Sequence, residues 1–103
     1  MSGASLYIVY PRKEGATFDK EYYIKTHLPL AQKVWEKHGM KSYAITEFAP
    51  DSPYSIGVVA EFESLEGWGA AAKDSDTKQV IDDVKNFSSE GPILFAGNII
   101  GRN

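Results

Sequence analysis

The fold is decided by a stretch near the N-terminus, Ser5-Leu6-Tyr7-Ile8-Val9-Tyr10, which is rich in β-branched and aromatic residues. Such residues favour strands, and Pro11 and Gly15 end the run, so we expect a strand over residues 5–10. Apolar residues occupy both alternating positions, so both faces of the strand are hydrophobic. A sheet built around this strand therefore needs cover on both of its faces.

A helix is expected next. Asp19 can cap its N-terminus and Gly39 suits its C-terminal end, which predicts a helix over residues 20–38. Pro29 lies inside it and cannot donate a hydrogen bond to the carbonyl of Lys25. We therefore expect either a kink or a short first helix that restarts with Pro29 in its first turn.

The rest of the chain predicts three strands and a second helical region. The strands are bounded by turn residues and are expected over residues 41–48, 54–62 and 93–100. Ser64 can cap the second helical region, which residues 74–76 interrupt. The order βαββαβ with right-handed crossovers predicts an α+β, ferredoxin-like fold, in which a four-stranded antiparallel sheet carries both helices on one face.

Composition narrows the classes of protein. The chain has 103 residues, of which 43% are hydrophobic, and we interpret residues 1–103 as a single domain. The formal charge of −3 and the scattered basic residues argue against nucleic acid and membranes as partners. The chain has no cysteine, which excludes a disulfide and a thiolate metal site and suits a reducing compartment. No secretory signal pattern is present, so we expect a cytoplasmic protein.

The strands also predict a partner. Apolar residues occupy both faces of the first, third and fourth strands, and the helices can cover only one face. A monomer would expose several hundred Å² of apolar sheet, which soluble domains rarely do. We therefore expect a homodimer in which the free sheet faces meet.

One histidine is the candidate catalytic residue. On a helical projection His27 falls in the apolar stripe with Leu30, Ala31 and Val34, so its imidazole is expected to point at the sheet. It could be a core histidine held by a tyrosine hydroxyl or a carbonyl. It could equally be a general acid or base, because a neutral imidazole both takes and gives a proton near pH 7.

Aromatic side chains are the candidate substrate contacts. The chain has six tyrosines and two tryptophans, a composition that suits a pocket for a flat aromatic or polyketide-like ligand or simply fills a small core. The candidate contacts are Tyr7, Tyr10, Tyr23, Tyr54, Trp68 and Phe87. No spacing predicts a metal or nucleotide site, and we expect no cofactor. His38, Asp82 and Asp83 are interpreted as solvated residues.

The motifs Tyr10-Pro11, Phe18-Asp19 with Tyr22-Tyr23, and His27-Leu28-Pro29-Leu30 resemble those of the EthD domain, a member of the dimeric α+β barrel superfamily. Near the end, Asp83 and Phe87 are in place, although Val84-Lys85 replaces the Ile-Pro pair common in that family. The resemblance spans nearly the whole chain. It implies a ferredoxin-like fold, a homodimer formed by the sheets, and a pocket between sheet and helices.

The resemblance leaves the function open. The family is named for an accessory role beside a cytochrome P450 system that degrades a fuel ether, and it is loosely classed with oxidoreductases. Superfamily relatives include cofactor-free monooxygenases, polyketide cyclases, muconolactone isomerases and haem enzymes; a haem would need His27 as its ligand in a wide cavity. We therefore hypothesise a cofactor-independent enzyme of the monooxygenase, dehydratase or cyclase type with His27 as acid or base. The alternative is a non-catalytic hydrophobic-ligand-binding or accessory protein.

Overall fold

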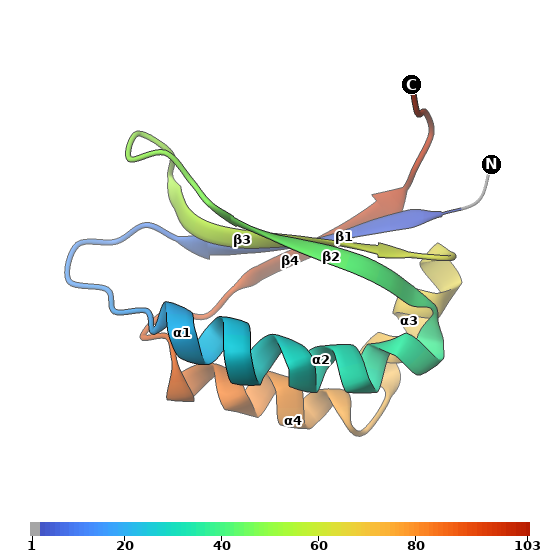
Figure 1. Ribbon diagram of the computed structural model, residues 1–103, viewed down its shortest axis with the longest axis horizontal. Coiled ribbons are helices and arrows are strands. Elements are labelled where there is room, and N and C mark those ends of the chain that lie inside the picture. The colour runs from blue at the N-terminus through green and yellow to red at the C-terminus, as the bar shows by residue number, and fades with distance from the viewer. Residues whose placement is uncertain (1–2) are drawn as a thin grey trace.

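The protein is a four-stranded antiparallel sheet with all of its helices on one face (Figure 1). The computed structural model describes residues 3–103. In spatial order the strands are β2 (Met40–Glu47), β3 (Tyr54–Phe62), β1 (Ala4–Pro11) and β4 (Ile93–Asn98). The α+β, ferredoxin-like fold expected from the sequence is confirmed. The last strand ends at Asn98 rather than residue 100, and Ile100 is 94% exposed.

The first helical region changes its geometry along its length. It consists of α1 (Lys20–Tyr22), the π-helical segment η1 (Tyr23–His27), α2 (Leu28–Trp35) and the 3₁₀ segment η2 (Glu36–His38). The backbone N–H of Leu28 donates to the carbonyl of Tyr23, five residues earlier, immediately before Pro29. The disturbance predicted from proline is thus a widened π-turn, after which α2 starts with Pro29 in its first turn.

The caps of both helical regions are those expected. Asp19 Oδ1 accepts from the backbone N–H of Tyr22 at 3.1 Å, and Ser64 Oγ accepts from that of Gly67 at 3.0 Å. The second region consists of α3 (Leu65–Lys73), α4 (Thr77–Asp82) and the 3₁₀ segment η3 (Asp83–Asn86). No helix among residues 3–103 is long and apolar enough to cross a membrane.

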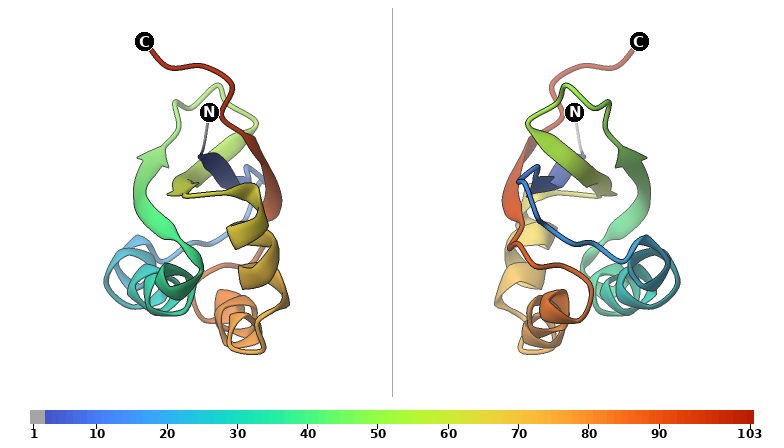
Figure 2. Two further views of the ribbon diagram at one scale, coloured as in Figure 1. Left: turned by 90° about the vertical axis from the view of Figure 1, so that its right-hand side faces the viewer. Right: turned by 90° about the vertical axis from the view of Figure 1, so that its left-hand side faces the viewer.

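The core lies between the sheet and the helices. Leu6, Tyr10, Tyr23 and Phe62 are almost completely buried there. The sheet curls around this core, so that β2 lies on the side of α1 and α2, whereas β4 lies on the side of α3 and α4 (Figure 2). The two helical regions together therefore cover the inner face of the sheet.

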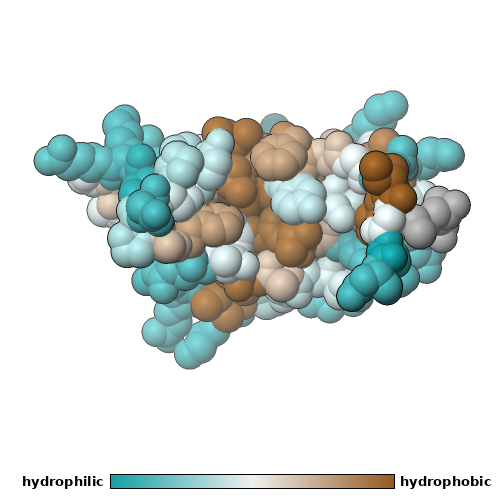
Figure 3. All heavy atoms as spheres, turned by 90° about the horizontal axis from the view of Figure 1, so that it is seen from above, coloured by the Kyte–Doolittle hydropathy of each residue, from teal (hydrophilic) through white to brown (hydrophobic). Residues whose placement is uncertain are grey.

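The outer face of the sheet carries exposed apolar side chains. Tyr7 stacks on Phe95 with ring centroids 5.3 Å apart, and Val59 is opposite Tyr7 in the sheet register. The exposed fractions are 41% for Tyr7, 52% for Phe95 and 36% for Val59. Figure 3, viewed onto this face, shows an apolar patch at its centre between hydrophilic ends. The predicted two-faced hydrophobicity is confirmed, whereas the homodimer stays a prediction.

Candidate functional site

The site is built around His27, the last residue of the π-helical segment η1. Only 5% of His27 is exposed. Its imidazole stacks on the ring of Tyr23, with centroids 5.4 Å apart and planes 14° apart, and lies 4.4 Å from the ring of Phe87. Two aromatic rings from different helical regions therefore fix the plane of the imidazole.

Asp83 is the hydrogen-bond partner of this imidazole. Nδ1 of His27 lies 3.0 Å from Oδ2 of Asp83, across 56 positions of sequence. The other carboxylate oxygen, Oδ1, accepts from the hydroxyl of Tyr22 at 2.6 Å and from Nδ2 of Asn86 at 2.9 Å. Both oxygens of Asp83 are thus engaged, and the carboxylate is held in one orientation.

The pKa values define the charge state of this pair. Burial lowers the pKa of His27 below 6.5 and outweighs the opposing effect of Asp83. Burial tends to raise the pKa of Asp83, but hydrogen bonds from Tyr22, Asn86 and His27 outweigh it, so this pKa is lowered. At neutral pH the pair is a neutral imidazole beside an ionised carboxylate.

The carboxylate also determines the tautomer. An ionised carboxylate can only accept hydrogen bonds, so we assign the imidazole proton to Nδ1. Within residues 3–103 no hydrogen bond engages the other ring nitrogen, Nε2 of His27. Nε2 is therefore the basic atom available to a ligand, which is the arrangement that a general base requires.

A cavity of about 390 Å³ adjoins His27, and we call it the His27 cavity. It lies between the inner face of the sheet, α2 and the second helical region. Its lining includes the aromatic rings of Tyr10, Trp35 and Trp68, along with Ile8, Val80, Val84 and Leu94. The buried Thr77 also lines it, but its hydroxyl oxygen accepts from Nε1 of Trp35 at 3.0 Å. The walls are thus largely apolar, with His27 as a polar group free to meet a ligand.

The candidate contacts predicted from the sequence fall into three groups. Tyr10 and Trp68 line the His27 cavity. Tyr23 and Phe87 lie directly against His27 and do not line the cavity themselves. Burial raises the pKa of Tyr10 and of Tyr23, so these phenols stay protonated at neutral pH.

The two remaining candidates are not brought to this cavity. Tyr7 lies on the outer sheet face, 41% exposed, because its position in β1 alternates with those of the buried Leu6 and Ile8. Tyr54 begins β3 at the end of the β2–β3 loop, and its carbonyl accepts from Arg12. Neither residue lines the His27 cavity.

Asp83 is a residue of this site that the sequence analysis missed. We expected it to be solvated, but its side chain is only 13% exposed and three side chains donate to it. It begins the 3₁₀ segment that brings Phe87 against His27, and it lies three residues after the buried Val80. That spacing from an apolar helical position was a usable signal. His38 is less solvated than expected, because its side chain is 23% exposed and its Nε2 lies 2.7 Å from Oδ2 of Asp74.

Nowhere in residues 3–103 do three or more histidine or carboxylate side chains gather as metal ligands would. The His27–Asp83 pair supplies only two such groups.

Comparison with known proteins shows the fold. The structure is similar to an EthD-like protein from Ralstonia eutropha JMP134, with a TM-score of 0.84 and 20% identity over 100% of this chain and 96% of that one. It is similar to an ethyl tert-butyl ether D family protein from Bacillus halodurans C-125, with a TM-score of 0.71 and 22% identity over 97% and 100%. No family model matches the chain, and no curated protein matches it significantly.

A third similar structure is SnoaB from Streptomyces nogalater, a cofactor-independent oxygenase. Its TM-score is 0.67 and its identity 8%, and the match covers 100% of both chains. At such identities these likenesses establish the ferredoxin-like architecture, and the function of this chain has to be argued from its own site.

Proposed function

We propose that this chain is an EthD-like, cofactor-independent enzyme that acts on a flat aromatic or polyketide-like molecule in the His27 cavity. The observation that carries the proposal is the His27–Asp83 pair, 3.0 Å apart, beside an apolar cavity with aromatic walls. A volume of about 390 Å³ suits a small ligand of fused rings. The motifs shared with EthD domains and the similar folds of two EthD-like proteins support the assignment to this class.

In this mechanism Nε2 of His27 takes a proton from a phenol or an activated carbon of the ligand. The lowered pKa keeps the imidazole neutral and ready to accept at pH 7. When it has accepted, the new positive charge lies beside the carboxylate of Asp83, which stabilises it. Asp83 also holds the proton of the resting imidazole on Nδ1, so it acts as a positioning residue.

Proton removal begins several reactions, namely oxygenation, dehydration and cyclisation, and the site serves each of them. We choose oxygenation as the first reaction to test, because SnoaB, which has a similar fold, is a cofactor-independent oxygenase. For an anthrone substrate, the atoms and electrons of the oxygenation balance with O₂ as the oxidant. The deprotonated ring carbon reduces O₂, a C–O bond forms, and loss of water from the hydroperoxide converts the CH₂ group to a carbonyl.

The proposed assembly is a homodimer. Tyr7, Val59, Ile93 and Phe95 form an exposed apolar patch on the outer sheet face, and a second copy of the same patch can cover it. The helices lie on the opposite side of the sheet, so this contact leaves the His27 cavity with its own walls.

The test uses 1,8-dihydroxyanthrone as the probe. Oxygen uptake and quinone absorbance are measured above the uncatalysed rate, with thermal melts of every variant. His27→Gln is expected to lower turnover by about 10² or more while the melting temperature changes little. Turnover equal to that of the unaltered protein would contradict the role of His27. Binding without turnover would overturn the enzymatic proposal in favour of a ligand-binding or accessory protein.

A further inference from the structure

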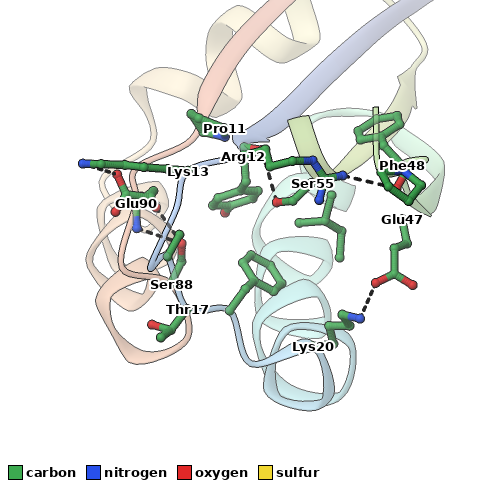
Figure 4. A pocket seen from close by; sticks show the side chains of 15 residues that line it. Pro11, Arg12, Lys13, Thr17, Lys20, Glu47, Phe48, Ser55, Ser88 and Glu90 are labelled. Atoms are coloured by element: carbon green, nitrogen blue, oxygen red, sulfur yellow. Dashed lines mark hydrogen bonds and ion pairs between the residues drawn. The ribbon is translucent and has the colours of Figure 1, made fainter. Parts of the chain in front are cut away.

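A second, larger cavity lies beside the end of β1 and the β2–β3 loop. We call it the Arg12 cavity; its volume is about 570 Å³. It lies where the end of β1, the segment that leads to α1, the β2–β3 loop and the segment before β4 converge (Figure 4). Its lining includes Arg12, Ala16, Phe18, Ser55, Ile56 and Tyr10. Tyr10 borders both cavities, and the two share no other lining residue within 3–103.

The guanidinium of Arg12 is fixed by backbone carbonyls. Its Nε donates to the carbonyl of Ser52 at 2.9 Å, and its Nη2 lies 3.1 Å from that of Tyr54, 3.2 Å from that of Ala49 and 3.4 Å from that of Phe48. These bonds hold the side chain along the β2–β3 loop at the cavity wall, as Figure 4 shows. The hydrogen bonds among residues 3–103 leave its Nη1 without an acceptor.

The charges of the cavity are unevenly balanced. Lys13 lies 3.6 Å from Glu90, and Lys20 forms an ion pair with Glu47, so two of the cations at the rim have carboxylate partners. Arg12 makes no ion pair with a carboxylate in the described part of the chain. The cavity therefore has one uncompensated positive charge, and it is carried by the cation whose position is best fixed.

We propose that the Arg12 cavity binds a small organic acid with an aromatic or acyl body, whose carboxylate meets the free edge of the Arg12 guanidinium. The carboxylate would accept hydrogen bonds from the N–H groups of Nη1, and the positive charge of the guanidinium would strengthen them. The apolar body would contact Tyr10, Phe18 and Ile56 in the interior. Because the carbonyls already hold Arg12 in place, binding loses little side-chain freedom.

This inference is independent of the proposed function, since none of its residues takes part in proton transfer. The probe is 2-naphthoate, followed by isothermal titration calorimetry in a buffer free of carboxylates and phosphate. Its matched control is 2-naphthamide, which has the same rings and no charge. We expect naphthoate to bind at least tenfold more tightly than naphthamide and to bind more weakly as NaCl is raised. Equal binding of the two probes would overturn the proposal.

Two variants with matched substitutions show in which of the two cavities naphthoate binds. Ala16→Phe fills the Arg12 cavity and Ala72→Phe fills the His27 cavity, and both alanines are exposed residues at a cavity wall. We expect Ala16→Phe to abolish naphthoate binding and Ala72→Phe to leave it within twofold. The reverse pattern would place the probe in the His27 cavity and overturn the proposal.

Two further variants test whether binding of naphthoate depends on Arg12 and is independent of His27. Arg12→Gln is expected to lose the preference for naphthoate over naphthamide; because Arg12 also holds the β2–β3 loop, its thermal melt is measured alongside. Retention of the preference in a folded Arg12→Gln protein would contradict the assignment. His27→Gln is expected to bind naphthoate normally, so failure of the acid site and failure of the catalytic proposal are distinguishable.

Discussion

Replacing Asp83 with alanine tests whether the hydrogen bond between His27 and Asp83 stabilises the folded protein. The substitution leaves Nδ1 of His27 without its partner at a side chain that is only 6% exposed. A buried donor left unpaired costs about 1–3 kcal/mol. With a loss of about 2 kcal/mol, the melting temperature of a domain of this size should fall by roughly 8–16 °C.

The assay is thermal unfolding followed by circular dichroism at pH 7.5, with Asp82→Ala as the matched control. Asp82 is the adjacent residue, at the end of α4, and is exposed, so its removal should change stability by less than about 0.5 kcal/mol. Asp83→Asn should melt between the two, because an amide oxygen can still accept from Nδ1 of His27. Equal melting of the two alanine variants would refute the view that Asp83 supports the imidazole.

Three further predictions follow from the packing and the pKa values. Gly67→Ala should destabilise the protein by about 1–3 kcal/mol, because the added Cβ would overlap the carbonyl oxygen of His38. Gly69→Ala, in the same helix, meets no such atom and should stabilise the protein by up to about 1 kcal/mol. Denaturant melts in which the two variants are equally stable would contradict this packing. Val59→Asp should shift the protein in sedimentation from twice the chain's 11.4 kDa to the monomer at micromolar concentration, and an unchanged mass would rule out the outer face as the interface. The pKa of His27 is lowered from 6.5, so the unaltered protein and His27→Gln should melt alike above pH 6.5, and the unaltered protein should lose stability relative to the variant as the pH falls through the lowered pKa; a pH-independent melting difference would be the contrary result.

The fold could be predicted because local signals agreed with one another. The β-branched and aromatic residues of β1, the caps at Asp19 and Ser64, and the left-handed Gly39 with φ of 97° all point to the same elements. The π-turn before Pro29 could only be predicted as a disturbance. Proline removes a donor from the helix, but whether the chain then kinks or widens depends on which side chains the surrounding core accepts.

The candidate site could be predicted in part. His27 was found because its apolar neighbours in the helix place it against the sheet, and its burial is as expected. Its partner was not found, because Asp83 lies 56 positions away in the sequence and was interpreted as a solvated residue. Tyr7 was grouped with this site on composition alone, and strand alternation puts it on the outer face. Pairing between distant elements depends on tertiary placement, which local periodicity does not encode.

The central claim is that burial keeps the imidazole of His27 neutral and that Asp83 holds its proton on Nδ1, leaving Nε2 as the base in the His27 cavity. Long-range ¹H–¹⁵N NMR of the imidazole nitrogens at pH 7, assigned with His27→Gln, measures this directly. The account predicts a neutral ring protonated on Nδ1, and an Nε2 resonance that shifts when 1,8-dihydroxyanthrone is added but not when the cavity is filled by Ala72→Phe. A charged ring, a proton on Nε2, or an Nε2 resonance indifferent to the anthrone would contradict it.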